Sequence, residues 1–430
     1  MKASEVRGAI RTRDSVDSTQ NVFLKYRVKL VDGQPPERVA AQLANSLVSG
    51  VSKSLGWFAN PFESAVVVDL VDHGETWGFE VAVPVAIFGN LLNFPQLLTL
   101  AWLPSEYGST SRVWIEDIRL PSSLITSTTG PAFGAEGILA RIPTNDGLPI
   151  LAAIVKPRFG GELEGLAKAM TEVLSAGFDV VVDDEVTYDP SGEFSFDRRL
   201  KVLTAVVQKT SVTGAQKHLF MNVTCPIRDF ERRVLQCASE GATGIIANSF
   251  TMGYPYFEYA SEICSANNLV LIDCAIGATM MSLPGESTGT SAELLAKLAR
   301  YAGADASHTG SEGEHWYSIS ILTRILGSLG GQISGVRPTL PVVAGGVSVA
   351  NVWTKLEPFG RRCMVDLGTG LWHHPAGPAK GAEQIIRILN EIPEDMSAPE
   401  ARAKINAICG RERTFAAAMR DFGYEYKPSR

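Results

Sequence analysis

The sequence has no hydrophobic run long enough to cross a membrane and no excess of basic residues. None of its 430 residues belongs to an uninterrupted apolar segment of about 18 residues, and residues 1–20 lack the apolar core of a secretory signal. The net charge of -7 argues against nucleic acid or an anionic membrane surface as a partner. We therefore expect a cytoplasmic protein that binds a small molecule, with no nucleic acid and no membrane partner.

Cysteine is sparse and scattered. No two of the six cysteines have the CxxC spacing of a zinc site, and the chain lacks the dense cysteine pattern of a disulfide framework. We therefore expect a reducing compartment, with unpaired thiols at Cys225, Cys237, Cys264, Cys274, Cys363 and Cys409.

The apolar content is sufficient for two domains. Hydrophobic residues make up 45% of the chain. A chain of 430 residues is too long to fold around one small core. Residues 1–20 are predicted to be a flexible arm. An N-terminal α+β domain of the ferredoxin-like type is predicted over 21–120, with strands at 23–31, 64–72, 76–83 and 111–119 and helices at 37–46 and 87–99. Residues 121–148, rich in Ser, Thr, Gly and Pro, are predicted to be a linker.

Short apolar strands then alternate regularly with helices. The strands are expected at 150–155, 178–182, 218–223, 244–247, 269–273, 304–307, 340–343 and 363–367. This count and spacing predict a (β/α)8 barrel over 149–395, followed by a helical extension over 396–430. An open, doubly wound sheet is the alternative architecture.

The carboxyl ends of the strands are the candidate site, because barrel enzymes place their chemistry there. The second strand ends on Asp183-Asp184-Glu185, three acids that need a cation, cationic side chains or water. Taken alone, such a triplet is more often a solvated turn. Polar residues or glycines also occur at the ends of the other strands, and this favours a functional role for the acids.

Two basic residues follow the first barrel strand. Lys156 is expected to direct its amine into the barrel mouth, where a lysine can carry protons; the alternative is an ordinary surface lysine. Arg158 retains its proton, so its predicted role is to hold a phosphate or carboxylate. A structural ion pair is an equally good interpretation of Arg158.

Glycines follow the seventh and eighth strands. Gly345-Gly346 and Gly368-Thr369-Gly370 stand where backbone N–H groups of barrels cradle phosphate, although glycines also form plain turns. His308, after the sixth strand, is a candidate for binding an anion or a carbonyl, or for holding its own loop. Asp273 closes an apolar strand as a candidate base, metal ligand or ion-pair partner.

Together these residues resemble the large subunit of RuBisCO, and more specifically the RuBisCO-like proteins called form IV. The resemblance runs from about residue 23 to about residue 390. Its most specific matches are Ile154-Val155-Lys156-Pro157-Arg158 and Gly177-Phe178-Asp179 with Asp183-Asp184-Glu185. The other matches are at 33–37, Gly89-Asn90, 118–121, 130–134, Ser307-His308-Thr309-Gly310, Ala344-Gly345-Gly346, and Gly368-Thr369-Gly370 with His374-Pro375.

The resemblance implies an N-terminal α+β domain, a (β/α)8 barrel and a homodimer. Each active site would combine one barrel mouth with the partner's N-terminal domain, so that Asn90 would bind substrate across the interface. The resemblance also implies magnesium, held by Asp184, Glu185 and a carbamylated lysine.

Departures from the family pattern fall where carbon dioxide fixation needs particular residues. Val182 stands where the resemblance places the carbamylated lysine, so magnesium is a tentative prediction, with Asp273 as a candidate replacement ligand. Arg158 replaces a lysine, Asp273-Cys274 replaces a histidine and an arginine, and residues 311–316 lack the lysine of the family. We therefore expect no carboxylation or oxygenation of ribulose bisphosphate.

The remaining residues suit chemistry next to a ketone. Lys156 beside carboxylates can stabilise an enediolate or assist cleavage of an adjacent bond, and the loss of an arginine at Cys274 predicts a substrate with one phosphate. RuBisCO-like proteins without the lysine resemble enzymes of sugar-acid catabolism. That resemblance implies carbon-carbon cleavage of a phosphorylated β-keto sugar acid, such as 3-oxo-isoapionate 4-phosphate, by hydrolysis or decarboxylation. The alternatives are an enolase or isomerase of methylthio-sugar phosphates in methionine salvage and a non-catalytic sugar-phosphate binding protein.

Overall fold

The computed structural model describes residues 9–50, 64–89, 91–106, 110–144, 147–283, 288–313 and 317–425. The chain divides into two compact units, one formed from 1–129, 277–301 and 332–336 and the other from the remaining segments. Within the described residues, the helices are all too short or too polar to traverse a bilayer.

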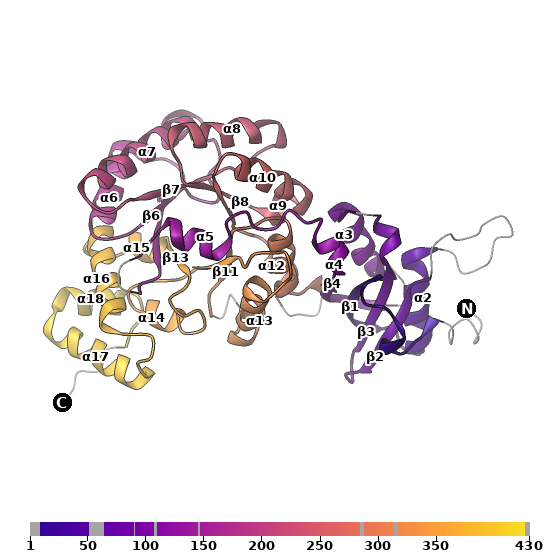
Figure 1. The fold of residues 1–430 in the computed structure, drawn as a ribbon. Coiled ribbons are helices and arrows are strands. Elements are labelled where there is room, and N and C mark those ends of the chain that lie inside the picture. The colour runs from indigo at the N-terminus through magenta and orange to yellow at the C-terminus, as the bar shows by residue number, and fades with distance from the viewer. Residues whose placement is uncertain are drawn as a thin grey trace. The chain divides into compact units, whose positions relative to one another are not determined.

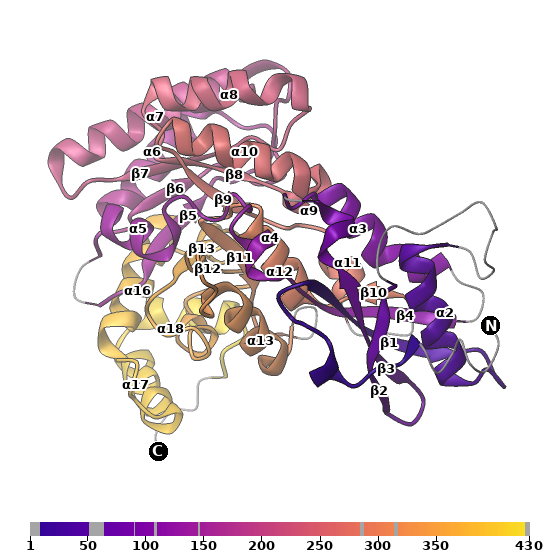
Figure 2. The same ribbon diagram turned by 45° about the vertical axis from the view of Figure 1, so that its right-hand side comes forward.

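The first unit is built on a five-stranded mixed sheet with the order β10-β4-β1-β3-β2. The central strand β1 (Asn21–Leu30) pairs antiparallel with β3 (Trp77–Pro84) and β4 (Thr110–Arg119), and β2 (Val66–Asp72) extends the sheet beyond β3. The helix α2 (Pro36–Val48) begins with a proline and buries Val39, Leu43 and Leu47. The predicted α+β domain is confirmed (Figure 2).

Several segments of the first unit differ from the prediction. The helix expected at 87–99 is divided into a short turn (Val85–Phe88) and α3 (Phe94–Trp102), which Asn93 caps by accepting from the Gln96 N–H at 3.0 Å. Within the predicted flexible arm, Arg13 forms a 2.7 Å ion pair with the buried Glu80. The segment 277–301 also belongs to this unit and contains α11 (Thr279–Ser282), β10 (Gly289–Thr290) and α12 (Ala292–Tyr301).

The second unit is a closed barrel of eight parallel strands in the order β11-β12-β13-β5-β6-β7-β8-β9. The strands are β5 (Ile150–Ile154), β6 (Val180–Val182), β7 (His218–Asn222), β8 (Gly244–Ala247), β9 (Val270–Asp273), β11 (Ala306–Gly310), β12 (Leu340–Ala344) and β13 (Met364–Leu367). All eight overlap the segments that the sequence predicted, although β11 extends beyond its predicted end. Closure of the sheet excludes the open doubly wound alternative.

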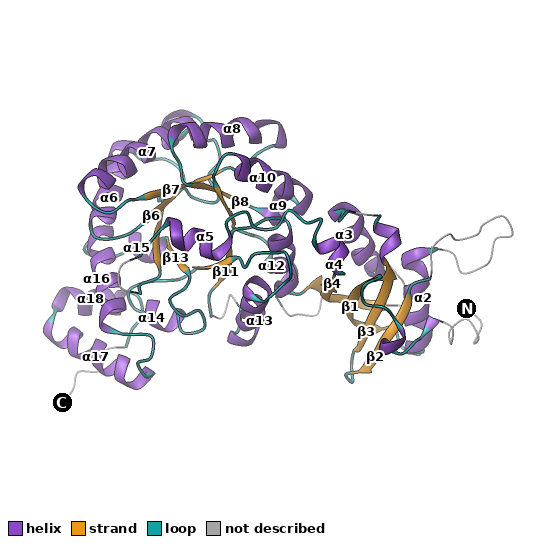
Figure 3. Cartoon of the chain, in the orientation of Figure 1, coloured by secondary structure: helices purple, strands orange, loops and turns teal. Residues whose placement is uncertain are grey.

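Helices surround the ring of strands in Figure 1, and Figure 3 shows the same separation of strands inside and helices outside. The longer helices of the second unit are α6 (Leu163–Ser175), α7 (Phe196–Thr213), α8 (Ile227–Glu240), α10 (Tyr254–Ala266), α13 (Ile319–Gly330), α16 (Pro378–Glu391), α17 (Ala398–Arg411) and α18 (Arg413–Asp421). The last two occupy the region where a helical extension was predicted. Short helices α9 (Ser249–Met252), α14 (Val352–Lys355) and α15 (Thr369–Trp372) follow strand ends.

The barrel interior is filled by apolar side chains from alternate positions of the strands. Val180 and Val182 of β6 belong to this core, together with Ile154 and Phe220 from the neighbouring strands. Three β-branched residues in succession suit a strand that is buried on both faces. Val182 is therefore a core residue at the last position of its strand.

The predicted linker contains a helix that contributes to the barrel core. The helix α5 (Gly134–Arg141) places Ile138 and the following Ile142 in the core cluster, and the N–H groups of Phe133 and Gly134 donate to Asp305 Oδ1 at 2.7 and 2.8 Å. The predicted linker over 121–148 thus includes a helix that packs against the barrel core. Its Ser, Thr, Gly and Pro content obscured a helix of two turns.

Candidate active site

The carboxyl ends of the barrel strands bring together one lysine, one histidine and several buried acids. Lys156 follows β5, Asp184 and Glu185 follow β6, and His308 lies within β11 rather than after it. Asp273 ends β9. Of the residues predicted from the sequence, Asn90 lies outside the described part of the chain.

Asp184 is held by two basic side chains. Its Oδ2 accepts from the Lys156 ammonium in a short ion pair and from Arg158 Nε at 3.3 Å, while Oδ1 accepts the Val186 N–H at 3.0 Å. Asp184 is fully buried, whereas the Arg158 side chain is half exposed. Lys156 therefore has a fixed position at the end of β5, and Arg158 keeps part of its guanidinium available at the surface of the mouth.

Asp183 is directed to the surrounding helix α7 rather than to Lys156. It forms a paired contact with the buried Arg199 of α7, with Nε and Nη2 each at 2.9 Å from a carboxylate oxygen. Burial raises the pKa of Asp183, and the charge and hydrogen bonds of Arg199 oppose that shift. Asp183 therefore anchors α7 to β6 and leaves Asp184 and Glu185 to the site.

His308 faces a second group of acids. Its Nε2 lies 3.2 Å from Oδ2 of Asp366, which belongs to β13. Burial acts to lower the pKa of His308, but the hydrogen bond and charge of Asp366, with the charges of Glu185 and Asp273, outweigh this effect and raise it. The imidazole is therefore favoured in its charged form.

Glu185 is the acid best placed to exchange a proton. Burial raises its pKa, the charges of Asp184 and Asp366 raise it further, and His308 acts in the opposite direction. Its Oε2 and the Asp366 Oδ1 are buried without a hydrogen-bond partner. For Glu185, whose pKa is raised, an unpaired buried oxygen favours the protonated carboxylic acid. The sequence analysis did not identify Asp366, although a single acid within the apolar strand 363–367 was a usable signal.

Asp273 has a framework of contacts that accounts for its burial. Its Oδ1 accepts the N–H groups of Ser249 and Ala275, each at 3.1 Å, and its Oδ2 accepts from Ser307 Oγ at 3.3 Å. Burial raises the pKa of Asp273, and the hydrogen bonds from the backbone N–H groups oppose that shift without cancelling it. Both oxygens are thus engaged in holding the ends of β8, β9 and β11. This arrangement supports a positioning role beside His308 and leaves the predicted catalytic role of Asp273 untested.

The glycines after β12 and β13 differ in what surrounds them. Gly345 and Gly346 have φ values of 89° and 66°, which other residues rarely adopt. A Cβ at Gly368 would lie 3.4 Å from Lys156 Cε, whereas one at Gly370 would lie 1.9 Å from the Val347 carbonyl oxygen. Gly368 therefore borders the site lysine, and Gly370 allows two loop backbones to pack closely.

The arrangement of these acids does not fit a bound metal ion. Within the described ranges, no three His, Cys, Asp or Glu side chains are grouped so that they could hold one. The Asp184 carboxylate is neutralised by Lys156, Val182 offers no ligand atom, and Asp273 is engaged with backbone N–H groups. The binding of magnesium therefore stays a prediction.

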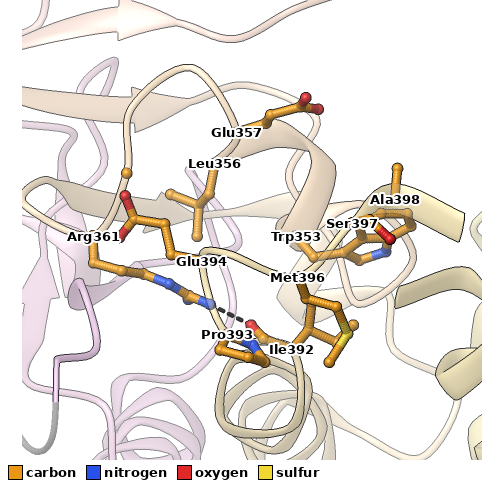
Figure 4. Close-up of a pocket in the computed structure, with 11 residues that line it drawn as sticks. Trp353, Leu356, Glu357, Arg361, Ile392, Pro393, Glu394, Met396, Ser397 and Ala398 are labelled. Atoms are coloured by element: carbon orange, nitrogen blue, oxygen red, sulfur yellow. Dashed lines mark hydrogen bonds between the residues drawn. The ribbon is translucent and has the colours of Figure 1, made fainter. Parts of the chain in front are cut away.

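A pocket of about 190 Å³ lies in another part of the barrel unit. Figure 4 shows its lining, which comes from α14, from the segment that leads to Arg361 and from residues 392–398. Arg361 Nη2 donates to the Ile392 carbonyl at 2.7 Å. None of the predicted site residues lines this pocket, and Arg361 precedes β13, which places it toward the amino end of that strand.

Comparisons with known proteins find similar sequences over part or most of the chain. Residues 139–318 match the model of the ribulose bisphosphate carboxylase large chain, catalytic domain. The chain is 28% identical to the ribulose bisphosphate carboxylase of Thermococcus onnurineus over 399 residues, which cover 87% of this chain and 88% of the relative. It is 24% identical to 2,3-diketo-5-methylthiopentyl-1-phosphate enolase of Bacillus licheniformis over 318 residues, 73% of this chain and 76% of the enzyme.

Solved structures show the same fold. The octameric ribulose-1,5-bisphosphate carboxylase/oxygenase of Pyrococcus horikoshii superposes with a TM-score of 0.85 at 22% identity, covering 97% of each chain. The dimeric enzyme of Hyperthermus butylicus superposes with a TM-score of 0.84 at 23% identity, covering 98% of this chain and all of that one.

Proposed function

We propose that the chain is a distant member of the RuBisCO large-chain family and that it is an enzyme of phosphorylated sugars that does not carboxylate ribulose bisphosphate. Its proposed reaction is cleavage of a carbon-carbon bond next to a ketone in a phosphorylated β-keto sugar acid. The reaction is a decarboxylation, or a hydrolysis that follows internal carboxyl transfer. The 3-oxo-isoapionate 4-phosphate type is the proposed substrate class.

This proposal is carried by two neighbouring features at the end of β6. A buried valine ends the strand, and the aspartate two residues later forms an ion pair with a lysine. Val182 is packed in the barrel core, and the adjacent Asp184 is neutralised by the ammonium of Lys156. A valine cannot form a carbamate, so the site lacks the base and ligand that the family resemblance implies for carboxylation. The positive charge beside Asp184 is the ammonium of Lys156, where the family resemblance implies a metal ion.

Lys156 and Glu185 support complementary steps of a decarboxylation. As the bond to the carboxylate breaks, its electron pair moves toward the ketone and carbon dioxide leaves. The Lys156 ammonium can donate to the oxyanion that develops on the ketone oxygen. The raised pKa of Glu185, caused first by burial, favours a protonated carboxyl that can then give its proton to the enolate carbon.

The charged groups at the mouth supply binding positions for the rest of the substrate. His308, charged beside Asp366, and the half-exposed Arg158 are proposed to bind anionic or carbonyl oxygens. The backbone at Gly345-Gly346 and at Gly368 is proposed to bind the single phosphate. Holding both ends of the substrate would align its breaking bond with Lys156.

A homodimer with shared active sites is proposed from the surface around the barrel mouth. Large apolar side chains are exposed in the segments that follow several strands: Phe159 after β5, Val186 after β6, Ile227 after β7, Ile276 after β9 and Ile319 at the start of α13 after β11. Exposed apolar side chains gathered at one end of a barrel are typical of a surface that another chain covers. The partner's N-terminal unit, which would bring its own Asn90, is the proposed cover.

A second candidate is enolisation of a methylthio-sugar phosphate. The similarity to the Bacillus licheniformis enolase favours it, and a lysine beside a ketone can stabilise an enolate without breaking a carbon-carbon bond. The two reactions differ in their products. Decarboxylation releases carbon dioxide, hydrolysis forms new carboxylates, and enolisation changes neither the carbon count nor the mass.

The test is incubation of the full-length protein with a panel of phosphorylated keto acids and methylthio-sugar phosphates, followed by mass spectrometry. We expect loss of carbon dioxide or formation of new carboxylates from a β-keto acid. Lys156→Met should lower kcat by about 100-fold or more, while Lys380→Met, at an exposed ion pair on α16, serves as the matched control. Turnover of the methylthio substrate alone would favour the enolase. Wild-type binding by Lys156→Met with no turnover by either protein would favour the non-catalytic alternative.

A further inference from the structure

Lys355 lies where the loops after β11 and β12 meet. It is the last residue of α14, the short helix that follows β12 and the glycine pair Gly345-Gly346. Its ammonium donates to Ser311 Oγ at 2.9 Å and, in a shorter contact, to the Glu312 carbonyl oxygen. Ser311 Oγ in turn donates to the Gly345 carbonyl oxygen at 2.6 Å. One lysine thus connects two strand ends of the barrel mouth.

We infer that Lys355 supplies the positive charge of a phosphate site at Gly345-Gly346, an inference that rests on the proposed function. The space beside Gly346 carries the inference. An atom at the Cβ position of Gly346 would lie 3.8 Å from Lys355 Nζ and would meet no other group of the described chain within 4 Å. The missing side chain therefore leaves open space directly in front of an ammonium group.

The charge of Lys355 is not balanced by an ion pair with any described carboxylate. Its acceptors are the Ser311 hydroxyl and the Glu312 backbone carbonyl, both neutral, and the Glu312 side chain acts on it only through its charge. A lysine ammonium has three N–H donors, so two contacts leave one for a ligand. An anion bound beside Gly346 would use that donor and would pair with the charge.

The electrostatic setting agrees with an anion as the ligand. Burial lowers the pKa of Lys355, while the charge of Glu312 acts in the opposite direction. A phosphate next to the ammonium would favour its charged form. Lys355 is about ten residues after Gly345-Gly346 and belongs to a different element. The helix α14 therefore positions the ammonium group, and the glycine turn positions the backbone N–H groups.

A purely structural lysine that joins the two loops is the competing explanation, and charge separates the two roles. Lys355→Gln keeps a hydrogen-bond donor for Ser311 and the Glu312 carbonyl but removes the charge. Lys355→Arg keeps the charge. Lys380→Gln removes an equivalent charge from the exposed ion pair with Glu383 and serves as the control.

The test is calorimetric titration of the full chain with inorganic phosphate, at an ionic strength held constant with sodium chloride. We expect Lys355→Gln to raise the Kd by about tenfold or more, as for loss of one charge-assisted hydrogen bond. Lys355→Arg should stay within about threefold of the wild type, and Lys380→Gln should match it.

The inference is overturned if Lys355→Gln, folded with an unchanged Tm, binds inorganic phosphate with the wild-type Kd. Gly346→Ala, checked for folding in the same way, separates this outcome from failure of the proposed function. Loss of binding in Gly346→Ala alone would keep the phosphate site and remove only the role of Lys355. A wild-type protein that does not bind phosphate would overturn both.

Discussion

His308 on β11 and Asp366 on β13 are joined by a buried contact of 3.2 Å between Nε2 and Oδ2. β12 lies between their strands, so the two side chains meet across the barrel interior rather than along one ladder. Their contact places a charged imidazole among the acids of the mouth. Because this contact is stronger when His308 is protonated, the stability of the barrel should change as His308 gains or loses its proton.

We expect this pair to stabilise the protein more in mild acid than in mild alkali. The pKa of folded His308 is raised, so its contribution is complete below the unfolded pKa of about 6.5 and is lost as the pH rises through the folded pKa. Asp366→Asn should therefore lower the free energy of unfolding by about 1 kcal/mol more at pH 6 than at pH 9, measured by urea denaturation. In a His308→Asn background this pH dependence should disappear; its persistence there would assign it to other groups.

Introducing a lysine at Val182 should destabilise the protein without creating carboxylase activity. Val182 packs among apolar core residues, and an unpaired ammonium there would cost several kcal/mol. We expect Val182→Lys to lower the free energy of unfolding by more than about 3 kcal/mol. The milder Val182→Ala should cost about 1 to 3 kcal/mol. Carbon dioxide fixation by a stably folded Val182→Lys protein would show that this position alone blocks carboxylation.

Arg199 should be needed for folding rather than for chemistry. Its removal leaves Asp183 buried without a charge partner, and breaking such a pair costs about 3 to 5 kcal/mol. Arg199→Met should therefore lower Tm strongly while leaving KM of the surviving folded enzyme near the wild-type value. Arg198→Met, one residue earlier on α7, is the matched control for loss of a guanidinium. A changed KM with an unchanged Tm would instead place Asp183 in the active site.

Turnover should survive exhaustive chelation. Lys156 already neutralises Asp184, and the described residues include no set of three ligands for a metal ion. The assay compares enzyme dialysed against a chelator with untreated enzyme, while elemental analysis checks that the metal has been removed. Activity that is lost on chelation and restored by magnesium would contradict this expectation and would require Lys156 to leave Asp184.

The amino-acid pattern alone was enough to predict the two-domain architecture. Short apolar segments located the eight barrel strands, because a parallel strand buried on both faces needs a short apolar run. The same pattern predicted chemistry at the strand ends, with Lys156, Asp184, Glu185 and His308 as candidate site residues. The helix α5 was missed because its two turns bury little apolar surface on their own.

Only the tertiary structure decided what each polar residue contacts. Asp183 and Asp184 are adjacent in sequence, yet one pairs with Arg199 of a surrounding helix and the other with Lys156 of a neighbouring strand. Asp366 and Lys355 entered the site through contacts between strand ends that are distant along the chain. Residue patterns specify which face of an element is buried, but pairing of charges depends on distances that only the closed barrel fixes.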